Sequence, residues 1–149
     1  MVEVTGTWGL DEVENFLKEQ TVPIRVGYPI SEKKTWMISL WYQYESGELH
    51  CATQTEAKVV KNLRESGHCS FEVSTNRPPY KGVRGNGEVR LEEDDDKKTL
   101  RALIERYLGN TDSDLAKKLL ADDREETRIR ILPETVYSWD FTGRMPSAN

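Results

Sequence analysis

One segment of the sequence joins an expected strand to an expected helix and carries the residues best suited to bind a ligand. Residues 51–64 read Cys-Ala-Thr-Gln-Thr-Glu-Ala-Lys-Val-Val-Lys-Asn-Leu-Arg. Backbone N–H groups and the helix dipole make a helix N-terminus attractive to anions. Lys58 and Lys61 share one helix face, so both ammonium groups can reach a single phosphate. The segment indicates an anion site, although an ordinary surface helix capped by Thr55 fits the same pattern.

Three further features could contact a ligand. Arg25 lies in the apolar segment 22–28 and needs a carboxylate or phosphate partner, unless it points outward to solvent. Trp41 could stack on an aromatic ligand or could simply pack in the core or an interface. Residues 80–85, which include Arg84, place basic side chains beside glycines, where a cofactor or a second subunit can approach closely.

Composition and missing motifs exclude several classes of function. A formal net charge of −5 disfavours general affinity for nucleic acid. The sequence has no GxSxG, Walker or HExxH motif, and His50 and His68 are expected to be structural or solvent-exposed. Any catalysis would then be the chemistry of a cofactor that the protein positions.

The remaining composition indicates a cytoplasmic protein with a real core. There is no basic-then-apolar leader and no apolar run of about 18 residues, so we expect neither export nor a membrane. Cys51 and Cys69 are expected as buried thiols on strands. The acidic run 92–96 is expected to form a solvated turn rather than a metal site.

Periodicity predicts the elements that position these residues. Alternation with a period of two predicts strands, and a period of 3.6 predicts helices. The expected order is a helix from a cap at Asp11 to before Pro23, strands over 21–29, 34–44 and 48–53, a helix between Thr55 and Gly67, strands over 68–74 and 80–92, a helix ending at Gly109, a helix over 112–121, and a strand over 127–141 broken at Pro133. Because most connections between strands are short, this order predicts one α+β domain over 1–149, mainly an antiparallel β-barrel with flanking helices.

Five short motifs, in the right order over about residues 22–91, resemble one known family. They are Pro23-Ile-Arg-Val, Leu40-Trp-Tyr-Gln-Tyr before a glycine hairpin, Cys51-Ala-Thr, Lys58-x-x-Lys-Asn-Leu-Arg64, and Tyr80-Lys-Gly-Val-Arg-Gly-Asn-Gly-Glu-Val89. The chain thus resembles the pyridoxamine 5′-phosphate oxidase-like family, also called the flavin-binding split barrel.

The resemblance implies a homodimer with one FMN or deazaflavin F420 in each of two clefts between subunits. It implies that five residues surround the cofactor phosphate: Thr53, Thr55, Lys58, Lys61 and Asn62. Arg25 is implied as a further contact. Trp41 and the strand segment Lys81–Arg84 are implied near the flavin ring or the dimer interface.

The chain also departs from the family pattern. Pyridoxamine phosphate oxidases carry an Arg-x-His substrate motif near the C-terminus, whereas this sequence has no histidine after His68. The expected function is therefore an FMN- or F420-dependent oxidoreductase acting on some other small molecule. The alternative is a non-enzymatic carrier or sensor that holds a flavin or haem on the same barrel.

Overall fold

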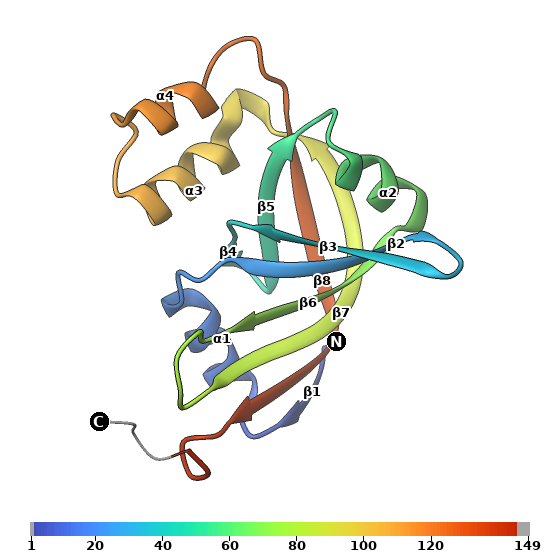
Figure 1. Cartoon of the computed structure of the whole chain (residues 1–149), viewed down its shortest axis with the longest axis vertical. Coiled ribbons are helices and arrows are strands. Elements are labelled where there is room, and N and C mark those ends of the chain that lie inside the picture. The colour runs from blue at the N-terminus through green and yellow to red at the C-terminus, as the bar shows by residue number, and fades with distance from the viewer. Residues whose placement is uncertain (1, 146–149) are drawn as a thin grey trace.

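The computed structural model describes residues 2–145, which form one twisted sheet with helices packed around it (Figure 1). The strands are β1 (Glu3–Gly6), β2 (Ile24–Ser31), β3 (Lys34–Leu40), β4 (Gln43–Glu45), β5 (Glu48–Gln54), β6 (His68–Ser74), β7 (Lys81–Glu93) and β8 (Glu126–Asp140). Their order is β3-β2-β6-β7-β8-β5-β4, with antiparallel neighbours, and β1 pairs in parallel with β8. Because β3 and β4 do not pair, the curved sheet remains open, as in a split barrel. The mainly antiparallel fold expected from the sequence is confirmed.

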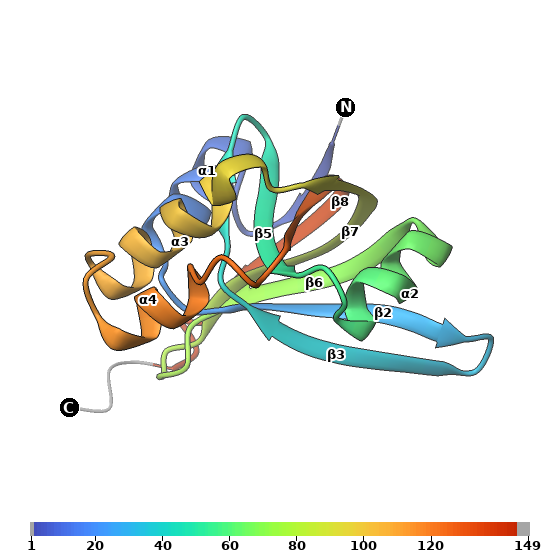
Figure 2. The same cartoon turned by 90° about the horizontal axis from the view of Figure 1, so that it is seen from above.

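The helices cover different parts of the sheet (Figure 2). They are α1 (Leu10–Glu19), α2 (Lys58–Ser66), α3 (Lys98–Leu108) and α4 (Asp114–Leu119), with a single 3-10 turn η1 at Asp95–Lys97. The buried faces of α1 and α2 join the main core of the barrel, whereas α3 and α4 form a second, smaller cluster with Trp41 and Ala52. No helix within residues 2–145 has both the length and the apolar character needed to cross a bilayer.

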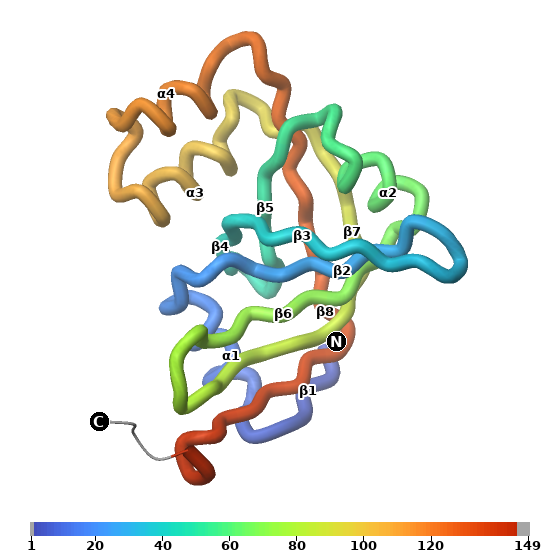
Figure 3. Tube along the Cα trace, in the orientation of Figure 1, coloured from blue at the N-terminus to red at the C-terminus, as the bar shows by residue number. Residues whose placement is uncertain are grey.

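The strand β8 runs beside β7 for almost its whole length and links two parts of the sheet (Figure 3). Its first half pairs with β5 and its second half with β1. The predicted break at Pro133 does not occur, because β8 continues through this residue. Instead the β7 register shifts between Asn86 and Gly87, where a Cβ on Gly87 would lie 2.4 Å from the Leu132 carbonyl oxygen. The bulge accommodates the proline, which has no N–H to donate.

Two other expectations for the chain path were wrong. The strand predicted over 34–44 is interrupted at Trp41 and Tyr42, because the Tyr42 side chain is fully buried and its hydroxyl donates to the Leu17 carbonyl at 2.8 Å. The short strand β1 was not predicted, since four mostly exposed residues show little alternation. The cap of α1 is Gly9 rather than Asp11, and the Glu12 carboxylate accepts the Gly9 N–H at 3.3 Å.

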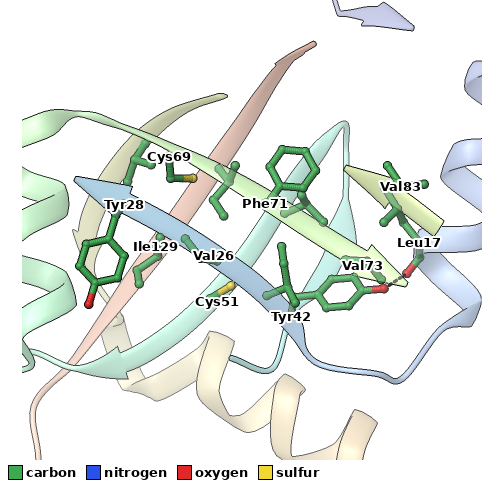
Figure 4. Close-up of a cluster of buried hydrophobic side chains, with 14 of the residues drawn as sticks. Leu17, Val26, Tyr28, Tyr42, Cys51, Cys69, Phe71, Val73, Val83 and Ile129 are labelled. Carbon is green, nitrogen blue, oxygen red and sulfur yellow. Dashed lines mark hydrogen bonds between the residues drawn. The ribbon is translucent and has the colours of Figure 1, made fainter. Parts of the chain in front are cut away.

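The main core contains both cysteines, as predicted. Cys51 and Cys69 lie among the apolar side chains of β2, β6, β7 and β8 (Figure 4), with exposed fractions of 0% and 1%. Burial raises the pKa of the Cys51 thiol far above its usual value and that of Cys69 to about 12. The thiolate form, which would be needed for chemistry, is therefore strongly disfavoured at neutral pH.

Candidate functional site

The junction between β5 and α2 forms as the sequence predicts, but it is capped differently. Thr55 is not the cap of α2: its hydroxyl lies 2.9 Å from the Thr127 hydroxyl, and its N–H donates to the Glu125 carbonyl at 2.9 Å. The cap is Ala57, whose side chain cannot accept a hydrogen bond, and the first turn of α2 contains no acidic residue. The positive end of this nine-residue helix is therefore left without a side-chain acceptor of its own.

The lysines beside this helix end are exposed. The Lys58 ammonium lies 5.7 Å from the centre of the Trp36 ring on β3, a cation–π distance. Within residues 2–145, neither Lys58 nor Lys61 lies within 4.0 Å of a carboxylate oxygen. The Asn62 amide nitrogen donates one hydrogen to the Lys58 carbonyl at 3.0 Å, and its second hydrogen is not used in that bond. Both positive charges remain available to an anion.

Arg25 and Arg84 lie on the opposite face of the sheet from α2. Their neighbours Val26 and Val83 point into the core, so the two arginines point away from it. Both line a hollow of about 470 Å³ on the outer face of the sheet, here called the sheet-face hollow. The Arg25 guanidinium donates to the Pro23 carbonyl at 2.7 Å, and within residues 2–145 no carboxylate oxygen lies within 4.0 Å of it.

Arg84 packs against exposed aromatic side chains within this face. Its guanidinium carbon lies 4.5 Å from the centre of the Tyr137 ring and 5.8 Å from that of Trp139. Tyr137 remains 40% exposed and Met37, which lines the same hollow, is 68% exposed. Large apolar groups at this level of exposure are typical of a surface that meets another molecule.

Trp41 and Thr53 line a second hollow, of about 370 Å³, between the sheet and helices α3 and α4. We call it the apolar hollow because six large apolar side chains line it: Leu40, Trp41, Leu100, Leu103, Leu115 and Leu119. The Trp41 ring is held by stacking on Tyr107 of α3, with ring centres 5.2 Å apart and planes 10° apart. The stacking fixes one wall of the hollow.

The charged residues that line the apolar hollow are Arg124 and Glu126, which sequence reasoning missed. The Glu126 side chain is 1% exposed, and an Arg124 guanidinium nitrogen lies 3.1 Å from one carboxylate oxygen. That contact lacks hydrogen-bond geometry, and neither oxygen accepts a hydrogen bond from a group in residues 2–145. Burial raises the pKa of Glu126, while Arg124 opposes the shift. The alternation of charged residues at 124, 126, 128 and 130 resembled an exposed strand face, so the sequence held no signal of burial.

The same pair borders a third hollow, of about 540 Å³, here called the acidic hollow. Seven carboxylates and three basic side chains line it. Part of this lining comes from the predicted acidic turn, where Asp95 and Asp96 are exposed as expected. Asp94 is not solvated: it is buried and accepts the Thr99 and Leu100 N–H groups at 2.9 Å each, which caps α3. Residues 2–145 contain no group of three or more side chains suited to hold a metal ion.

The two histidines lie outside these hollows. The His50 ring nitrogen Nε2 lies 2.9 Å from the Glu48 carboxylate, and His68 is exposed with Nδ1 3.0 Å from the Ser66 carbonyl oxygen. Both positions match the structural or exposed roles expected from the sequence.

Comparison with known proteins identifies the architecture. A conserved hypothetical protein from Mycobacterium tuberculosis superposes over 100% of this chain and 96% of its own, with a TM-score of 0.77 and 17% identity. The chain has the fold of a split barrel. An F420 reductase covers 82% of this chain and 94% of its own, with a TM-score of 0.63 and 17% identity. A FAD-binding protein from Mesorhizobium loti covers 88% and 93%, with a TM-score of 0.64 and 18% identity. No family model and no curated protein sequence matches the chain.

Within this split barrel the eight predicted site residues fall into three groups. Thr55, Lys58, Lys61 and Asn62 lie at the β5–α2 junction, Trp41 and Thr53 line the apolar hollow, and Arg25 and Arg84 line the sheet-face hollow. Pro23 connects two of the groups, because it borders the apolar hollow and its carbonyl accepts the Arg25 guanidinium. The eight residues therefore do not form one cluster within this chain, and the two arginines lie on the opposite face of the sheet from α2.

Proposed function

We propose that the protein is an oxidoreductase that uses a phosphate-bearing flavin-type cofactor, FMN or F420, to act on a small organic molecule. The observation that carries the proposal is the helix α2, which begins without a side-chain cap beside two lysines that have no carboxylate oxygen within 4.0 Å among residues 2–145. A phosphate supplies the charge and the acceptors that this helix end lacks. The fold supports the same proposal, since other proteins that share it are named an F420 reductase and a FAD-binding protein.

The residues at the junction fit a phosphate group. Lys58 and Lys61 would supply the positive charge, and the Thr53 hydroxyl and Asn62 amide would supply hydrogen bonds. The Thr55 hydroxyl, which meets Thr127, would instead hold the end of β5 against β8. Trp41 would supply an aromatic surface beside the site. When bound, the flavin supplies hydride transfer, and the protein supplies its orientation.

The proposal includes a homodimer with the cofactor between subunits, because Arg25 and Arg84 lie on the opposite face of the sheet from α2. Residues from a second copy could complete the site if the sheet-face hollow is an interface. Exposed Met37 and Tyr137 on that hollow support this arrangement. A Met37→Asp variant should then reduce both the solution mass measured by light scattering and cofactor retention. A wild-type protein that is monomeric at micromolar concentration would contradict the dimer.

The visible absorption spectrum tests the cofactor. Wild-type protein incubated with FMN or F420 and then desalted should retain the corresponding band, and the Lys58→Ala/Lys61→Ala variant should lose it. The matched control is Lys117→Ala/Lys118→Ala, which removes the same charge from the exposed side of α4 and should retain the band. If neither cofactor is retained by the wild type, the proposal fails.

The carrier or sensor alternative differs in one result. When both a reductant and an acceptor are supplied, an oxidoreductase shows repeated turnover, whereas a carrier retains the cofactor without turnover. Stopped-flow reduction and reoxidation of the loaded protein would distinguish the two functions.

A further inference from the structure

The Glu126 carboxylate in the wall of the apolar hollow is buried, and neither of its oxygens accepts a hydrogen bond from a group in residues 2–145. Its side chain is 99% buried, on the basis of a 1% exposed fraction, and lines both the apolar and the acidic hollow. A buried carboxylate is normally surrounded by hydrogen-bond donors, because transfer from water without them is costly. Here only the charge of Arg124 approaches one oxygen, at 3.1 Å, and the second oxygen, Oε2, has no donor within residues 2–145.

The charge around Glu126 favours a cation over an anion. The acidic hollow on its other side has seven carboxylates, including Glu126, against Lys97, Arg101 and Arg124. The Lys97 ammonium donates to the Ala121 carbonyl at 2.5 Å and keeps its positive charge, so carboxylates outnumber basic side chains by seven to three in this lining. A ligand with a negative charge would face repulsion from this excess of carboxylates, whereas a positive group would be attracted.

The shape and lining of the apolar hollow define the rest of the ligand. Its volume of about 370 Å³ lies at the small end of the range for small-molecule sites. The Trp41 ring and the leucines of α3 and α4 provide an apolar and aromatic wall, and the charged groups of the lining are Arg124 and Glu126, which lie 3.1 Å apart. This arrangement suits a molecule with an apolar body and one polar group that donates hydrogen bonds.

We propose that the apolar hollow binds a small organic amine, with its protonated nitrogen at Glu126 Oε2 and its apolar body against Trp41 and the leucines. The amine nitrogen would supply the donor that the buried carboxylate lacks. Burial raises the pKa of Glu126 when the hollow holds no such donor, and an adjacent ammonium group would favour the ionised form. Binding of an amine in this hollow does not depend on the proposed cofactor. That the amine is a substrate rests on the function proposed above.

Calorimetry with two probes of the same shape tests the site. 2-Phenylethylamine carries the ammonium group, and 2-phenylethanol replaces it with a neutral hydroxyl. Wild-type protein should bind the amine at least tenfold more tightly than the alcohol, because only the amine forms a charge-assisted hydrogen bond with the carboxylate. The Glu126→Gln variant keeps the shape of the side chain and should reduce this preference to less than threefold.

The matched control is Glu125→Gln, which changes the same charge on an exposed neighbour that lines only the acidic hollow. It should keep the full preference for the amine. Equal affinity of the wild type for the two probes, undiminished amine binding by Glu126→Gln, or no binding of either probe would overturn the proposal. Thermal unfolding of Glu126→Gln checks that a loss of binding does not reflect a loss of folding.

Cofactor retention, measured separately, distinguishes this proposal from the proposed function. Glu126→Gln should retain FMN or F420 like the wild type, and Lys58→Ala/Lys61→Ala should still bind the amine. Retained cofactor without amine preference overturns the amine site alone. Amine preference in a protein that retains neither cofactor overturns the oxidoreductase alone and leaves an amine-binding protein.

Discussion

Two groups of charged residues lie along the same face of β8, yet their surroundings differ sharply. Toward the middle of the strand, Arg130 donates to both Glu48 oxygens at 2.8 and 2.7 Å and to Glu92 at 2.8 Å. Arg128 donates to the other Glu92 oxygen. At the start of the strand, the Glu126 carboxylate lies 3.1 Å from an Arg124 guanidinium nitrogen, but neither of its oxygens accepts a hydrogen bond from a group in residues 2–145. The group around Arg130 is called the paired group below.

Glu48 and Glu126 are the same residue type, and they differ in how many hydrogen bonds their carboxylates accept. We infer that this difference separates a structural ion pair from a carboxylate that is available to a ligand. Glu48 is 20% exposed and fully bonded, and hydrogen bonds from Arg130 lower its pKa to about 2. Glu126 is 1% exposed, and burial without donors raises its pKa. Two glutamates that pack against one strand are thus shifted in opposite directions, and only one of them has a vacant position for a donor.

Removing Arg130 should produce the largest effect on stability. Arg130→Ala leaves the Glu48 and Glu92 carboxylates without their main donors, and we expect a loss of about 2 kcal/mol in the free energy of unfolding. Urea unfolding at pH 7 measures it. The control Arg90→Ala removes an exposed arginine that lies 3.4 Å from Glu88, and it should cost less than about 0.5 kcal/mol. Equal costs for the two variants would show that the paired group has no special role.

The cost of Arg130→Ala should shrink in acid. A carboxyl whose pKa is lowered by folding stabilises the protein above its unfolded value, and this contribution is lost as pH falls toward the folded value. For Glu48 that window runs from 4.5 down to about 2. We therefore expect the cost of about 2 kcal/mol at pH 6 to fall to about 1 kcal/mol at pH 3, after allowance for solvent screening. If the loss of unfolding free energy in Arg130→Ala does not change with pH, it comes from packing of the arginine side chain rather than from its ion pairs.

Replacing Glu126 should have a smaller effect of opposite sign. Glu126→Gln removes a buried charge that lacks donors, and we expect a gain of about 1 kcal/mol at pH 7. The pKa of Glu126 is higher in the folded protein than its unfolded value of 4.5, so the ionised carboxylate destabilises the fold only as pH rises above 4.5. The gain should therefore vanish at pH 4. A loss of stability at pH 7, measured by urea unfolding, would place Glu126 in the same structural class as Glu48.

The fold was largely predictable because its elements follow strong local rules. Alternation of Cys69, Phe71 and Val73 predicted β6, and Gly67 predicted the end of α2, which it does cap in the left-handed conformation. The missed features depend on distant contacts. Tyr42 breaks its strand because its hydroxyl finds a carbonyl 25 residues earlier in the sequence, and no local pattern records that partner.

The site was predictable only where its residues are close in sequence. Lys58, Lys61 and Asn62 lie within one turn of α2, so spacing alone placed them together. Glu126 could not be found in this way, since its burial depends on helices that precede it in the chain and on the return of β8 beside β5. The predicted involvement of Arg25 and Arg84 remains a prediction that depends on a second subunit.

The buried cysteines offer a means to follow the motions of the barrel. Cys51 lies on β5 and Cys69 on β6, and β7 and β8 lie between those strands in the sheet. An alkylating reagent can reach either thiol only when the surrounding structure opens, so the rate of labelling reports how readily that part of the barrel opens. Because β8 connects the two halves of the sheet, unequal labelling rates at the two positions would reveal whether one half opens before the other.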